Sequence, residues 1–214
     1  MAVSGVVKLA IYNGALRRLG SREIASLTEN REPRRVLEGL WGTGDRIVKL
    51  ALERGEWNFA IRAVAGIFSE SVTPTFGFSR AYDKPIDMAR LAALCPDEYF
   101  RVPLTNDQYV DEAGYWFADC GTLYIRYVSN DTSYGLNSTR WTEAFRDYLE
   151  CDLAWGACER ITNSGDKRDR MARDRMAALK VAKSHDAMQE GVKFPPRGSW
   201  VKSRVGWGRG SDQW

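Results

Sequence analysis

The side chains best suited to chemistry in this chain are one histidine, four cysteines and scattered carboxylates. A metal site needs several convergent ligands, and a nucleophile needs a base held beside it. His185 has no second histidine or neighbouring cysteine, and Cys95, Cys120, Cys151 and Cys158 show no C-x-x-C spacing. We therefore predict a structural or exposed histidine, four reduced and buried thiols, and no metal.

Four carboxylates near expected strands and turns are candidates for acid–base catalysis, namely Glu53, Glu56, Asp83 and Asp87. General acid–base catalysis needs carboxyl groups within reach of the same substrate, and nothing in the sequence pairs two of these across a cleft. Gly42 and Gly44 lack the preceding strand and the Lys-Ser/Thr pair of a phosphate loop. We predict solvated or salt-bridged carboxylates, no enzyme activity and no cofactor.

The charge is nearly balanced, with 31 Lys and Arg against 28 Asp and Glu, a net charge of +3. Dedicated DNA or membrane binders carry denser basic surfaces, and we expect no membrane partner. Residues from 165 onward hold 12 basic and 6 acidic side chains, so the basic excess lies towards the C-terminus. Acidic residues interleave with the basic run at 167–175, which predicts a solvated helix face with offsetting charges.

The hydrophobic pattern predicts an α+β fold that is mainly α: a helical bundle with a small inserted β-region and an extended C-terminal arm. Apolar residues at helical spacing predict helices over about 5–19, 31–54, 138–163 and 165–190. We expect glycines to kink the second helix and Ser138 to cap the third, which is broadly apolar and central. The fourth is peripheral, with a narrow stripe of Met171, Met176, Leu179 and Ala182.

Between these helices, short runs rich in Val, Ile, Phe and Tyr are separated by Pro, Gly and Asp, which predicts a β-rich insertion over about 57–130. The candidate strands are 57–68, 77–82, 90–94, 109–110, 114–117 and 122–128. The domain would thus span residues 1–190. We also expect Trp57 and Phe59 to anchor the first helices against the β-region.

Residues 191–214 hold two prolines, five glycines and three tryptophans spaced by seven, so they read as an arm. Trp and Arg are enriched at the energetic centres of interfaces, which favours another chain as the partner. The alternative that the arm is a plain tail stays open. The candidate binding residues are Arg197, Trp200, Lys202, Arg204, Trp207 and Trp214.

Four segments carry a resemblance to a known family. They are ALRRLG at 15–20, LERGEWNF at 52–59, YDKPID at 82–87 followed by Arg90, and GTLYIRYV at 121–128 followed by a long helix with Trp141, Phe145 and Leu149. In their order and spacing, over about residues 5–190, they resemble the bacteriophage head-to-tail adaptors, also called tail tubular protein A or gateway adaptors.

The resemblance implies a structural connector in the virion, made in the host cytoplasm and located at the head-to-tail interface. Its copies would form a ring, expected to be twelve-fold, between the portal protein and a tail or nozzle protein. Double-stranded DNA would pass through the lumen without sequence-specific binding. The alternative from another class is a nucleic-acid-binding regulator that uses the basic C-terminal helix and the arm.

Overall fold

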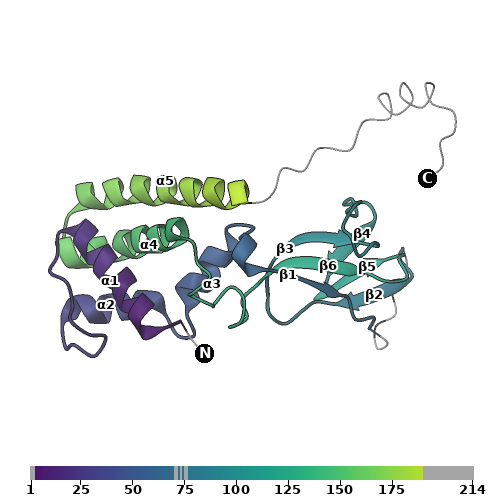
Figure 1. Ribbon diagram of the computed structural model, residues 1–214, viewed down its shortest axis with the longest axis horizontal. Coiled ribbons are helices and arrows are strands. Elements are labelled where there is room, and N and C mark those ends of the chain that lie inside the picture. The colour runs from purple at the N-terminus through teal and green to yellow at the C-terminus, as the bar shows by residue number, and fades with distance from the viewer. Residues whose placement is uncertain (1–2, 70–71, 73, 75–76, 190–214) are drawn as a thin grey trace, which may run out of the picture.

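The computed structural model describes residues 3–69, 72, 74 and 77–189, and the arm at 191–214 with its six candidate residues lies outside them. Within these residues the chain forms five α-helices and two three-stranded antiparallel sheets. The helices gather at one end of an elongated molecule and the strands at the other (Figure 1). A mixed α and β chain is confirmed. A mainly helical bundle fits only loosely, because the sheets enclose a hydrophobic core of their own.

Helix α1 spans Gly5–Leu19 and ends as expected at Gly20, whose φ of 69° is left-handed and favours glycine. The predicted helix at 31–54 is instead two helices, α2 at Glu32–Trp41 and α3 at Arg46–Glu53. Gly42, Gly44 and Asp45 between them all have positive φ, which a continuous helix cannot accommodate. Asp45 holds this corner, because its carboxylate accepts a hydrogen bond of 2.7 Å from Trp41 Nε1.

All six expected strand regions contain a strand, with shifted bounds. A short 3-10 helix, η1 (Asn58–Ala60), leads into β1 (Ile61–Ala65), and the others are β2 (Arg80–Asp83), β3 (Met88–Cys95), β4 (Tyr109–Glu112), β5 (Tyr115–Ala118) and β6 (Tyr124–Ser129). One sheet has the order β1-β6-β3 and the other β2-β5-β4. Side chains alternate along β6: on one face, Leu123, Ile125 and Tyr127 enter the core of the β-region. Val128, on the other face, joins the core of the helices.

Helix α4 spans Glu143–Thr162 and is the central helix, in contact with α1, α2, α3 and α5. Its N-cap is Thr142, whose side chain accepts a hydrogen bond from Phe145 N, so the expected cap at Ser138 is wrong by four residues. Ser138 is buried in the segment before the helix. The difference arises because either hydroxyl suits a cap in the sequence, whereas only Thr142 precedes the first helical turn.

Helix α5 spans Gly165–Gln189 and lies along the outside of the helical end (Figure 1). It is peripheral, as expected, and only Met171, Ala182 and Asp186 are buried. The apolar stripe was partly wrong, because the Met176 side chain is 64% exposed. A helix with so few buried residues needs other contacts to hold it against α4.

Candidate functional site at the junction of helices and sheets

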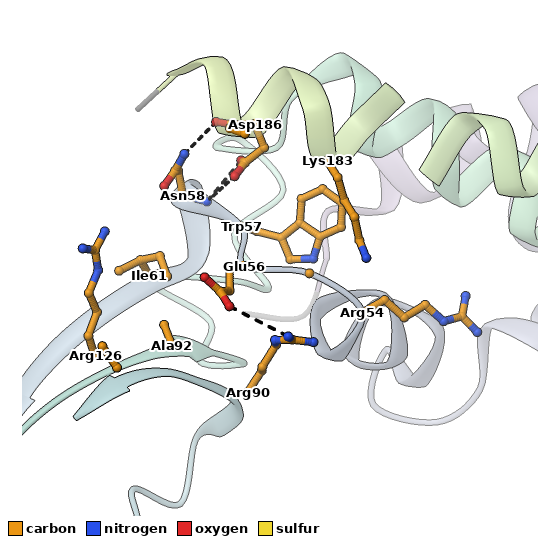
Figure 2. A pocket seen from close by; sticks show the side chains of 13 residues that line it. Arg54, Glu56, Trp57, Asn58, Ile61, Arg90, Ala92, Arg126, Lys183 and Asp186 are labelled. Carbon is orange, nitrogen blue, oxygen red and sulfur yellow. Dashed lines mark hydrogen bonds and ion pairs between the residues drawn. The ribbon is translucent and has the colours of Figure 1, made fainter. Parts of the chain in front are cut away.

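A cavity of about 450 Å³ opens where the helical end meets the sheets. Its walls come from the segment Arg54–Asn58 between α3 and β1, from β3 and β6, and from the C-terminal half of α5 (Figure 2). Elements far apart in the sequence therefore meet at one place. Junctions of this kind are common positions for binding sites.

Trp57 lies buried at the junction, and its contacts join α3 to α4, where we expected it to join the first helices to the β-region. Its side chain is 1% exposed, and its ring packs edge-on against Phe145 of α4 at 4.8 Å between centroids. Phe59 lies within 6.1 Å of the Trp57 ring, and Trp57 Nε1 donates a 2.9 Å hydrogen bond to the Ala51 carbonyl. The indole thereby ties the end of α3 to the central helix at the point where the chain enters the first sheet.

Asp186 of α5 closes the cavity from above and was missed by the sequence reasoning. Its carboxylate accepts hydrogen bonds of 3.1 and 2.9 Å from Asn58 N, and Asn58 Nδ2 donates a 2.7 Å bond to the Asp186 carbonyl (Figure 2). The signal for it is weak: Asp186 lies one helical turn after Ala182 on the buried stripe, where a carboxylate needs a partner.

Four cationic side chains line the cavity, against two carboxylates. Arg54, Arg90, Arg126 and Lys183 are the cations, and Glu56 and Asp186 are the acids. Glu56 lies 3.8 Å from Arg90, an exposed and therefore weak ion pair. Cations therefore outnumber carboxylates in the lining, and the hydrogen bond from the neutral Asn58 amide leaves the charge of Asp186 in place.

Arg54 turns away from the cavity towards α4 (Figure 2). It donates to the Tyr148 hydroxyl and lies 3.3 Å from Asp152, which also pairs with Arg175 of α5 at 2.5 Å. Burial and the charge of Asp152 raise the pKa of Tyr148, so its hydroxyl stays protonated.

The charged side chains of the run 167–175 are exposed as expected except for the half-buried Arg175, and two of its arginines also join α5 to α4. Arg168 pairs with Glu159 at 3.0 Å, and Arg175 pairs with Asp152. The Arg175 guanidinium also lies 4.4 Å from the centroid of the Trp155 ring, within the range of a cation–π contact. The interleaved sequence concealed these contacts, because both partners belong to another helix.

Of the four candidate carboxylates, Asp83 and Asp87 line one cavity of about 700 Å³ beside the β2–β3 turn, and Glu53 and Glu56 lie away from it. Glu53 and Glu56 are exposed and Asp83 is half-buried in β2. Asp87 instead accepts hydrogen bonds from Tyr127, at 2.9 Å, and from Ser129, and it pairs with Arg62 at 3.0 Å, so it fixes the turn between β2 and β3 to β6. The contacts that these carboxylates form, those of Asp87 and the ion pair of Glu56, are structural.

The remaining candidate groups are also dispersed. His185 is exposed on α5. All four cysteines are free thiols, and Cys120 is half-buried, which corrects the expectation of four buried thiols. Burial raises the pKa of the Cys151 thiol to about 11 and also raises that of Cys120, which disfavours the reactive thiolate.

Over the described ranges, no three His, Cys, Asp or Glu side chains form a group that could hold a metal ion. Among the same residues, no helix combines the length and apolar composition needed to cross a membrane. No protein-family model matches the chain, and no curated protein matches it at a significant level.

Proposed function

We propose that this protein is a structural head-to-tail connector of a tailed bacteriophage, not an enzyme, and that its copies form a ring between the portal and the tail. The observation that carries the proposal is the position of the four segments behind the family resemblance. Each lies where one part of the molecule is fixed to another. The four segments thus hold the helices and the sheets of the molecule together.

The first segment, 15–20, ends α1, and its Arg18 pairs with Asp147 and Glu150 of α4. The second, 52–59, contains Trp57 and forms the junction with the sheets. The third, 82–87, ends at Asp87, which ties the β2–β3 turn to β6. The fourth, 121–128, supplies most of β6, the central strand of its sheet. Together these segments support a helical bundle around α4 that carries an inserted β-region, the organisation that the resemblance implies.

Two separate ends suit a connector, which must contact one partner above and another below. We propose that the arm at 191–214 binds the portal through Arg197, Trp200, Lys202, Arg204, Trp207 and Trp214. The β-region would then lie towards the tail or nozzle protein. Contacts between neighbouring copies would repeat around the ring axis, so that weak pair contacts sum to a stable assembly.

Electron microscopy of the protein mixed with portal rings tests the proposal. We expect a collar of density on one face of the portal, with DNA passing through its centre in filled heads. Sedimentation of the protein alone at micromolar concentration should show mostly monomer, because the portal is the template. Portal rings that remain bare at saturating protein concentration would refute the connector role.

The exposed cations of α5 are also compatible with one alternative function, that of a nucleic-acid-binding regulator. Such a protein must hold its site at physiological salt, whereas a connector must let the duplex move through it. A gel shift that survives moderate salt and depends on the DNA sequence would favour the regulator.

A further inference from the structure

A second, shallow groove of about 470 Å³ runs along α5, next to the junction cavity. Its lining includes Met176, Leu179, Lys180 and Lys183, and Lys183 also lines the junction cavity. The two hollows therefore meet at this side chain. We call the surface that carries both hollows, from the middle of α5 to strand β3, the basic track.

Cations predominate along the basic track, and its two acids, Glu56 and Asp186, lie at the cavity end. Arg173, Lys180 and Lys183 are exposed, and spacings of seven and three residues put them on one face of the helix. Within the described part of the chain, none of the three makes a hydrogen bond or an ion pair through its side chain. No Asp or Glu occurs between residues 175 and 185. Across the cavity, Arg90 and Arg126 continue the cationic lining (Figure 2).

We infer that the basic track contacts the phosphate backbone of duplex DNA. The inference rests on the proposed connector function, and it names the surface that would face the lumen. From Arg173 to Lys183 the helix rises roughly 15 Å, which matches about four base-pair steps along a duplex. Cations that have no partner among the described residues, held in a row on a rigid helix, suit a regularly spaced polyanion.

The contact between the basic track and DNA should be weak, because only a few phosphates are neutralised, and a connector requires a weak contact. With about three phosphates neutralised, the affinity should fall roughly 40-fold between 50 and 200 mM salt, because the logarithm of the affinity falls by about 0.9 per contact for each tenfold rise in salt. At physiological salt the basic track would therefore bind the duplex only briefly, and the DNA could move on through the ring. No groove-reading element is needed, so the contact carries no sequence preference.

Fluorescence anisotropy with a labelled 30-base-pair duplex tests the inference on the full chain at 50 mM salt. We expect Lys183→Glu to weaken binding at least fivefold and the double variant Lys180→Glu/Lys183→Glu at least twentyfold, with a shallower salt dependence. The matched control is Lys167→Glu, because Lys167 is an exposed lysine of α5 about 160° around the helix from Lys183. It changes the net charge by the same amount and should alter binding less than twofold.

Arg90→Gln tests the cavity end of the basic track and should weaken binding at least twofold, with circular dichroism to verify that each variant is folded. Absence of DNA binding by the wild type at 50 mM salt overturns the inference, and so does an equal loss in Lys167→Glu, which would indicate a net-charge effect alone. Neither result touches the connector role, because the collar on portal rings is observed without DNA.

Discussion

Replacing Trp57 by Ala should lower the free energy of unfolding by about 3–5 kcal/mol, as large-to-small changes in cores do. The side chain is 1% exposed and contacts the Phe145 ring, so little can move in to fill the space. The change also removes the hydrogen bond to the Ala51 carbonyl, which contributes about 1 kcal/mol of this loss. Since domains are stable by only about 5–15 kcal/mol, the variant should be folded but markedly weakened.

Urea unfolding followed by circular dichroism measures the loss. For a slope near 2–3 kcal/mol per molar, the midpoint should fall by about 1–2 M with the slope unchanged. Trp57→Phe keeps an aromatic ring but loses the donor, and should cost about 1–2 kcal/mol.

Trp155→Ala is the matched control for the same substitution. Trp155 is half-buried on α4 beneath Arg175, so its replacement should cost about 1 kcal/mol. If Trp57→Ala loses less than about 1 kcal/mol, or no more than Trp155→Ala does, then the indole does not anchor the junction and the reasoning is wrong.

Three further predictions concern the junction, the turn at Asp87 and the arm. Asp186→Ala should cost about 2 kcal/mol and speed amide hydrogen exchange in the last turns of α5, because the bonds from Asn58 are lost; unchanged exchange there would contradict the role of Asp186. Although burial alone would raise it, hydrogen bonds from Ser129, Tyr127 and Arg62 lower the pKa of Asp87 below its ordinary 3.8. Its stabilising contribution is therefore present above that value and lost as the pH falls through the lower folded pKa, so Asp87→Asn should flatten the fall in stability between pH 5 and pH 2, measured by urea unfolding. Deleting residues 191–214 should leave the melting temperature of the rest nearly unchanged and weaken portal binding at least tenfold; truncated protein that joins portals as well as the full chain does would make the arm a passive tail.

The sequence located every strand region because two local signals agree there. Alternating apolar residues mark strands such as β6, and Pro, Gly and Asp mark the turns between them. The Ala113-Gly114 turn between β4 and β5 shows the second signal clearly, since both residues have positive φ, as a tight hairpin requires.

Helix bounds and polar contacts were harder to predict because they depend on neighbours distant in sequence. Glycines at 42 and 44 are compatible with either a kink or a break, and the break follows from Asp45, which turns to accept from Trp41. Asp186 reads as one more acidic residue on a polar helix until Asn58, 128 positions earlier, is brought beside it. The ion pairs of Arg168 and Arg175 were likewise not predicted, because their partners lie on α4.

These contacts explain how α5 is held with so little apolar surface. At its first half, Arg168 and Arg175 bind carboxylates of α4, and at its second half Asp186 binds Asn58 just before β1. The helix is therefore fixed to the helical end and to the entry of the sheet at once. A helix held only by a narrow apolar stripe could slide or rotate against its neighbour. Polar bonds at two separated points fix the position of α5 relative to α4. The last turn of α5, up to Gln189, is thus held by the same junction that contains Trp57, so damage at Trp57 should also loosen the end of this helix.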